Sequence, residues 1–98
     1  MSEGDSLARN YLTAFLRYLP RREEAALASG YELGRGAAIN GVSILDLARI
    51  HHDVLLTVLD DTPVEDVARV AAAASEFLVE VLATYDMIQR GLLQRERG

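Results

Sequence analysis

The stretch TPVEDVARVAAAASEFLVEVLATYDMIQRGLLQR (residues 62–95) decides the fold. Thr62 is a favoured N-cap residue, Pro63 suits the first helical position, and Glu65 completes a capping box. No proline follows, and the first glycine is Gly91. The stretch therefore predicts one helix of about thirty residues, roughly 45 Å long at 1.5 Å per residue.

An apolar seam runs along this helix when it is written as heptads. Two heptad positions are apolar throughout: Val64, Ala71, Leu78, Tyr85 and Leu92, and Val67, Ala74, Val81 and Ile88. Val70 and Phe77 flank the seam and widen it, so the helix should contact two or three others. The seam residues expected in the core or in a dimer interface are Val67, Ala71, Ala74, Leu78, Val81, Tyr85 and Ile88.

Two of the three shorter predicted helices have regular apolar faces. The first is capped by Asp5 or Ser6 and ended by Pro20, and its apolar residues are Leu7, Tyr11, Leu12, Phe15, Leu16 and Leu19. The third starts at Ile44 after a Ser43 capping box, and its apolar face is Ile44, Leu47, Ala48, His51, Leu55, Val58 and Leu59.

The second helix, expected from about Arg21 to Asn40, is unusual for the small residues on its inward face. That face comprises Leu27, Gly30, Tyr31, Gly34, Ala37 and Ala38. A glycine inside a helix costs about 1 kcal/mol against alanine, so this face predicts a closely packed neighbour. A break or bend near Gly34 is the alternative. Residues 1–98 together predict a single all-α domain, an antiparallel four-helix bundle that dimerises.

Composition excludes several classes of function. The chain has 98 residues, 50% of them apolar, a net charge of −5 and no cysteine. Acidic charge argues against nucleic-acid binding, and the lack of cysteine removes disulfides and thiolate chemistry. The start of the chain does not resemble a signal peptide, and no apolar run is long enough to span a membrane. A cytoplasmic location is expected.

His51-His52-Asp53 is the one cluster with chemical potential. Adjacent helical residues point about 100° apart, so the two histidines are a poor metal site. A histidine followed by an acidic residue is how histidine kinase dimerisation domains present a phosphoacceptor, and His52 has that position. The proline that usually follows is missing. The alternative is a structural histidine on a half-buried face, bonded to a neighbouring group.

No other arrangement predicts catalysis, a cofactor, a metal ion or a small-molecule substrate. Glu76 and Glu80 are one helical turn apart, but nothing supplies the other ligands of a metal-binding bundle, so a solvated face is expected. The chain has no phosphate-binding glycine loop, nucleophile elbow or catalytic triad.

Some apolar residues of the long helix lie off the seam, where charges are expected. Ala72, Val79 and Ala83 are of this kind, and Ala28 and Ile39 join them from the second helix. They form a partner surface, are buried by dimerisation, or are alanines chosen for helix propensity. The predicted partner-binding residues are Ala28, Arg35, Val79 and Ala83.

Several short segments, in this order and spacing, resemble the N-terminal domain of RsbU-type phosphoserine phosphatases over roughly residues 8–93. They are Tyr31-Glu32-Leu33-Gly34-Arg35, Gly41-Val42-Ser43 with Leu45 and Leu47, Ile50-His51-His52 with Leu55, residues 76–82, and Tyr85-Asp86-Met87. The fold implied is also similar to the C-terminal dimerisation domain of the clock protein KaiA.

The resemblance implies a non-catalytic domain that dimerises and binds a switch kinase of the RsbT kind. Binding would activate an attached PP2C-like phosphatase, which dephosphorylates an anti-anti-sigma factor in the general stress response. The chain ends before any metal-binding aspartates of such a phosphatase, so we expect an excised regulatory fragment or a free-standing relative. The alternative function is a histidine phosphotransfer domain with His52 as phosphoacceptor.

Overall fold

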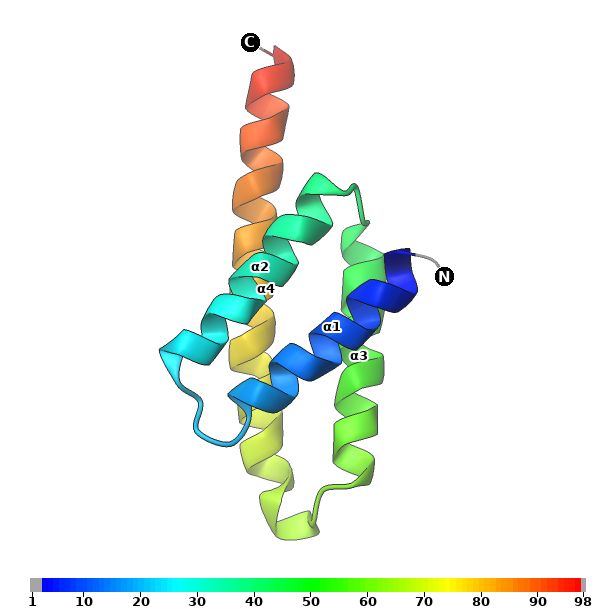
Figure 1. The fold of residues 1–98 in the computed structure, drawn as a ribbon, viewed down its shortest axis with the longest axis vertical. Coiled ribbons are helices and arrows are strands. Elements are labelled where there is room, and N and C mark those ends of the chain that lie inside the picture. Colours follow the sequence, from blue (N-terminus) through cyan, green and yellow to red (C-terminus); the bar gives the residue numbers. More distant parts are fainter. Residues whose placement is uncertain (1–2, 98) are drawn as a thin grey trace.

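The computed structural model describes the backbone of residues 3–97 and the side chains of residues 6–94. The helices, in chain order, are α1 (Glu3–Tyr18), α2 (Glu24–Ile39), α3 (Ile44–Asp60), a 3₁₀ turn η1 (Val64–Asp66) and α4 (Val67–Arg97). Successive α-helices run in opposite directions, and the α1–α2 hairpin lies across the α3–α4 hairpin (Figure 1). Within the described residues the fold is all-helical, which confirms the predicted four-helix architecture.

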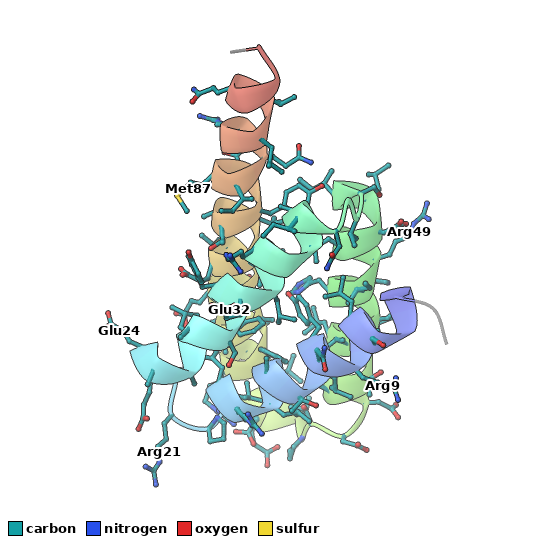
Figure 2. All side chains as sticks on the ribbon, turned by 45° about the horizontal axis from the view of Figure 1, so that its top comes forward. Arg9, Arg21, Glu24, Glu32, Arg49 and Met87 are labelled. Atoms are coloured by element: carbon teal, nitrogen blue, oxygen red, sulfur yellow. The ribbon has the colours of Figure 1, made fainter. Side chains whose placement is uncertain are left out.

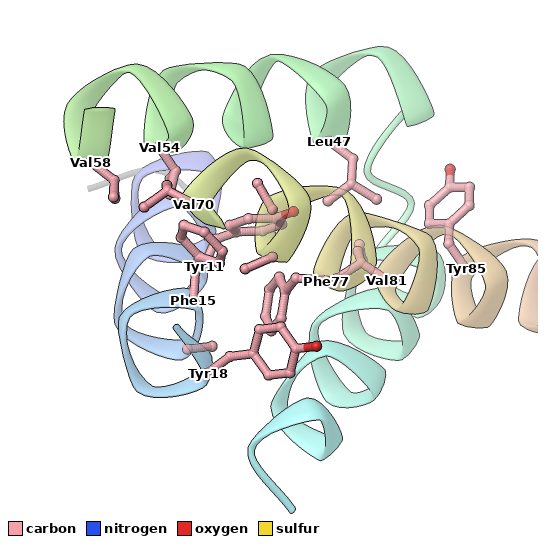
Figure 3. Packing of buried hydrophobic residues seen from close by; sticks show 14 of the residues in the cluster. Tyr11, Phe15, Tyr18, Leu47, Val54, Val58, Val70, Phe77, Val81 and Tyr85 are labelled. Atoms are coloured by element: carbon pink, nitrogen blue, oxygen red, sulfur yellow. The ribbon is translucent and has the colours of Figure 1, made fainter. Parts of the chain in front are cut away.

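Phe77 of α4 lies at the centre of the core and has no exposed surface. Three aromatic rings of α1 surround it, with centroids 5.3 Å (Tyr11), 5.7 Å (Phe15) and 5.7 Å (Tyr18) from its own. Figure 3 shows these rings between the helices, with Leu47 and Val54 of α3 reaching the same core. Aromatic contacts of this geometry add to the energy gained by area burial alone.

The buried stripe of α4 does not coincide with the heptad seam. It comprises Val70, Ala73, Ala74, Phe77, Val81, Thr84 and Tyr85. Within the described chain the core buries only part of the seam: Ala74, Val81 and Tyr85 are buried, whereas Val64 is 86% exposed and Val67 38% exposed. The cause is the period of the helix: a 3.6-residue repeat drifts around a strict heptad stripe by about 20° per heptad.

The closest helix contact is between α2 and α4, where the glycines lie. A Cβ atom on Gly34 would overlap the carbonyl oxygen of Val81 and would lie 3.0 Å from Thr84 Cβ. Gly30 faces Phe77 at ordinary contact distance, whereas a Cβ on Gly36 would meet nothing within 4 Å. α2 continues unbroken to Ile39, so the predicted close packing is confirmed and the predicted break is wrong.

Several predicted helix ends and faces are wrong. Capping by Thr62 fails because its hydroxyl donates backward to the Val58 carbonyl (2.6 Å), and α4 begins only after η1. α1 begins before Asp5 and Ser6, and α2 begins after Arg21. By contrast, Ser43 Oγ accepts a hydrogen bond from the Asp46 amide (3.1 Å), which confirms the cap of α3.

Four residues predicted to face inward are exposed instead: Leu16, Tyr31, Ile44 and Ala48. Five residues that the predicted apolar faces omitted are buried: Ala14, Tyr18, Val54, Ala73 and Thr84. The helices cross instead of running parallel in Figure 1, so each turn meets a different neighbour. A single apolar stripe per helix is therefore too simple a prediction for this bundle.

Candidate interaction surfaces

The α3–α4 hairpin carries an apolar face that no part of the described chain covers completely. We call it the α3–α4 face, and it consists of Ile44, Ala48, Leu55 and Leu59 on α3 and Val67, Ala71, Leu78 and Leu82 on α4. Ile44 is 50% exposed and Val67 38% exposed, both alanines are exposed, and the four leucines are half-buried. Contiguous exposed apolar area of this kind marks a binding surface.

The helical wheel places the two halves of this face together. On each helix these residues follow the buried stripe by roughly 60–140° in the same rotational sense, at 100° per residue. Because α3 and α4 are antiparallel and both present their buried stripes to the α1–α2 hairpin, the same sense on each helix turns the two sets toward each other, along the groove between α3 and α4. The other edge of α4 meets the α1–α2 hairpin, where Arg69 contacts the Leu19 carbonyl (3.5 Å) and Glu76 contacts Tyr18.

The predicted seam residues divide between the core and this face. Ala74, Val81 and Tyr85 are buried within their own chain, and Ile88 is half-buried. Val67, Ala71 and Leu78 lie on the α3–α4 face. Three of the seam residues that the core does not bury, Val67, Ala71 and Leu78, therefore lie on one side of α4.

The predicted partner-binding residues Ala28, Arg35, Val79 and Ala83 are all exposed, and Val79 is 65% exposed. They do not line one site. Ala28 lines an open groove of about 460 Å³ between α1 and α2. Arg35 lines a separate groove of about 240 Å³ between the end of α2 and α4.

Met87 is a surface residue that the sequence analysis missed. It is 55% exposed, projects outward from α4 in Figure 2, and lines the same groove as Arg35 and Ile39. Met87 follows Ala83 by one helical turn, as Ala83 follows Val79, so the three residues form one outward strip along α4. That spacing was the available signal, because it extends the predicted surface by one further turn.

The two histidines have different surroundings. His51 is half-buried, its Nδ1 lies 2.8 Å from the Tyr11 hydroxyl, and the two rings meet edge to face at 5.8 Å. Burial lowers the pKa of His51, and the neighbouring charge of His52 lowers it further. His52 itself is exposed. The structural interpretation is therefore confirmed for His51, but the predicted half-buried surroundings are wrong for His52.

Glu76 is exposed, as its spacing with Glu80 predicted, but it also has hydrogen-bond partners that the sequence did not reveal. It accepts hydrogen bonds from the Tyr18 hydroxyl (2.8 Å) and from Arg22 Nε (2.8 Å), and Arg22 Nη2 binds its second oxygen. Hydrogen bonds from Arg22 and then Tyr18 lower the pKa of the carboxyl group. The described residues contain no group of three side chains able to hold a metal ion.

Arg22 reaches Glu76 from a backbone conformation that is rare for a residue with a side chain, φ 53°. Its amide donates to the Tyr18 carbonyl (2.8 Å) and so satisfies the end of α1. One residue thus ends α1, turns the chain toward α2 and ties the turn to α4. At the other end of the bundle, the Tyr85 hydroxyl donates to the Val42 carbonyl (2.6 Å) and holds the α2–α3 turn.

Among the described residues, no helix combines the length and apolar character needed to cross a membrane.

Comparison with known proteins identifies the family. Searches of the curated proteins and of the solved structures gave no match, so the similarity to the clock protein stays a prediction. Residues 9–88, which include parts of all four α-helices, match the family model described as "Phosphoserine phosphatase RsbU, N-terminal domain". The chain therefore belongs to the family of RsbU N-terminal domains, which are regulatory.

Proposed function

We propose that this chain is a cytoplasmic, non-catalytic module that forms a homodimer and binds a switch kinase of the RsbT kind. Kinase binding activates an attached PP2C-like serine phosphatase and so controls a sigma factor by partner switching. The observation that carries the proposal is that α4 has apolar residues on both outer sides. Leu78 and Ala71 lie on the α3–α4 face, while Val79 and Ala83 are exposed on the other. One surface serves the second copy and the other serves the kinase.

Dimerisation through the α3–α4 face is the first part of the proposal. A specific interface buries about 1,000 Å² or more in total, counting both partners. A dimer is a symmetric assembly in which the same patch meets itself, so large and small residues must alternate within it. The α3–α4 face offers leucines beside alanines and carries no carboxylate. Static light scattering of the chain at tens of micromolar should give twice the monomer mass, and a monomer mass would reject this part.

Kinase binding by the strip Val79, Ala83 and Met87, together with Arg35, is the second part. Val79→Asp places a charge where a partner would have to desolvate it, so binding should weaken by more than about 1 kcal/mol. Leu56→Asp is the matched control, because Leu56 is 53% exposed and lies on α3 outside both proposed surfaces. Titration calorimetry with the purified switch kinase measures both variants. Normal binding by Val79→Asp, or loss of its dimer, would show that the surface is misassigned.

Phosphotransfer through His52 is the second candidate function, favoured by the exposure of that imidazole. A phosphoacceptor needs an accessible ring nitrogen, and the following Asp53 is also exposed. The regulatory proposal expects His52→Gln to bind the kinase normally. An acid-labile phosphate on the wild-type chain after incubation with a cognate histidine kinase, absent from His52→Gln, would instead support phosphotransfer.

A further inference from the structure

His51 occupies a place that the proposed function does not explain. It lies one helical turn from Ala48 and one from Leu55, on the edge of α3 that borders the α3–α4 face, and it is half-buried. Its Nδ1 is held 2.8 Å from the hydroxyl of Tyr11, which is 1% exposed and packs against Phe77. The imidazole is therefore fixed in the core on one side and faces a largely apolar surface on the other.

We propose that His51 makes the association of two copies through the α3–α4 face dependent on pH, stable at neutral pH and weakened in mild acid. This inference rests on the proposed dimerisation. A neutral imidazole with its proton on Nε2 accepts a hydrogen bond from the Tyr11 hydroxyl at Nδ1, whereas an imidazolium can accept no hydrogen bond. Burial raises the pKa of Tyr11, so its hydroxyl remains a donor. Charging His51 thus removes the acceptor for that donor.

The occupant is a second copy, because the α3–α4 face carries the part of the heptad seam that the core leaves open. Each copy carries a net charge of −5, and the repulsion between two copies is smallest where a face without carboxylates meets itself. The residues that define the α3–α4 face are aliphatic; half-buried His51 borders the face next to the core, and the exposed His52 and Ser75 border it on the solvent side. Covering this face removes the rest of the imidazole from water, and loss of water disfavours the charged form. The second copy also brings its own imidazole, so charging adds repulsion between like charges.

No carboxylate is placed to offset this charge among the described side chains. On α3, His52 is the adjacent titratable group, and Arg49 and Asp53 lie on exposed sides of the helix. On α1, Tyr11 faces His51, and Arg9 lies exposed about 160° around the helix from Tyr11. On α4, both glutamates lie on the edge toward the α1–α2 hairpin, and Glu76 is held there by Arg22.

The direction of the pH dependence follows from proton linkage. The dimer binds fewer protons at His51 than two monomers do, so dissociation takes up as many as two protons. The dissociation constant therefore rises as pH falls below the ordinary histidine pKa of about 6.5. For each proton taken up, it rises by up to about tenfold for each pH unit. Because burial lowers the pKa of His51, the change lies at the acidic end of this range.

The experiment measures the dimer dissociation constant of the full chain by sedimentation at pH 7.5, 6.5, 5.5 and 5.0. The variants are His51→Gln and, as the adjacent matched control, His52→Gln, with circular dichroism confirming that each is folded. From pH 7.5 to 5.0 the constant should rise at least about tenfold for wild type and for His52→Gln. It should change less than about twofold for His51→Gln. Tyr11→Phe removes the donor to the neutral ring, so its transition should move to higher pH.

Two results would overturn the inference while leaving dimerisation intact. One is a wild-type dimer whose dissociation constant does not change with pH. The other is a His51→Gln dimer with the pH dependence of wild type, which would assign the effect to another group. If His51→Gln does not dimerise, an unshifted transition in Tyr11→Phe overturns the inference. A wild-type chain that is monomeric at every pH would reject the proposed dimerisation together with this inference.

Discussion

Alanines lie on two sides of α4 with different surroundings: Ala73 and Ala74 are buried, whereas Ala71 is exposed. On the side facing α2, the glycines of α2 let two helix backbones meet, and a Cβ on Gly34 would strike the Val81 carbonyl. On the side away from α1 and α2, Ala71 is exposed although it belongs to the heptad seam. Alanines of α4 are therefore packed against another helix on one side and exposed to solvent on the other. A small residue needs a partner backbone before it contributes to stability.

The largest change in the free energy of unfolding should come from a substitution at the contact between α2 and α4. Gly34→Ala forces the two helices apart, and overpacking of this kind costs about 1–3 kcal/mol. We expect about 3 kcal/mol, because the obstacle is backbone and cannot rotate away. Gly36→Ala, two residues along the same helix, meets open space and should stabilise the chain by up to about 1 kcal/mol through helix propensity. Urea denaturation measures both, and equal effects would remove the distinction between the two sides.

A substitution on the α3–α4 face should change the dimer dissociation constant and not the free energy of unfolding. Ala71→Glu puts a carboxylate into the proposed interface and should raise the dimer dissociation constant at least tenfold, about 1.4 kcal/mol. Ala72→Glu is the matched control, since the next alanine is also exposed but lies 100° around the helix. Sedimentation measures the constant, and circular dichroism should show both variants equally helical. Equal dissociation constants for the two variants would mean that the face is not an interface.

A smaller change in the free energy of unfolding is expected at Tyr85, where α4 contacts the α2–α3 turn. Tyr85→Phe removes the hydrogen bond to the Val42 carbonyl and the acceptor for Gln89 Nε2 (3.2 Å). Loss of such a bond costs about 1 kcal/mol, because the carbonyl of half-buried Val42 loses its partner. The free energy of unfolding should fall by that amount, whereas Tyr31→Phe, at a 38% exposed tyrosine, should leave it unchanged. Two equal losses would show that the bond to Val42 is not responsible.

The smallest effect concerns Glu76, whose partner Arg22 is partly exposed. Because hydrogen bonds lower the pKa of Glu76 in the folded chain, its contribution is present above the unfolded value of about 4.3. The contribution is lost as pH falls through the folded pKa. Glu76→Gln should therefore reduce the loss of stability between pH 7 and pH 3, measured by urea midpoints. Glu32→Gln, at an exposed position, is the control, and an identical acid response in the two variants would contradict the assignment.

Local signals predicted the elements of this fold well. The spacing of apolar residues gave four helices, and the Ser43 cap needed only residues three positions apart. The glycines of α2 predicted a close neighbour because their cost inside a helix requires compensation. At Gly36 the same reasoning fails, since no neighbour lies there.

Interactions between distant segments could not be predicted in this way. The partners of Glu76 could not be predicted, because Tyr18 and Arg22 belong to another hairpin and no spacing along α4 reveals them. Thr62 looked like a helix cap, yet its hydroxyl satisfies the preceding helix. The surfaces were predicted residue by residue, but which residues share a groove depends on how α2 crosses α4. That crossing is set by the glycine contact in three dimensions.

The partnership of α2 with α4 also sets the order in which the chain can fold. These helices make the most extensive contact in the bundle, yet all of α3 and both of its turns separate them in sequence. Closing so long a segment has an entropic cost before the contact forms, which slows folding. During synthesis α2 emerges from the ribosome before the segment around Val81 does. The glycine face of α2 has no partner until then, so the contact between α2 and α4 can form only after most of α4 has emerged.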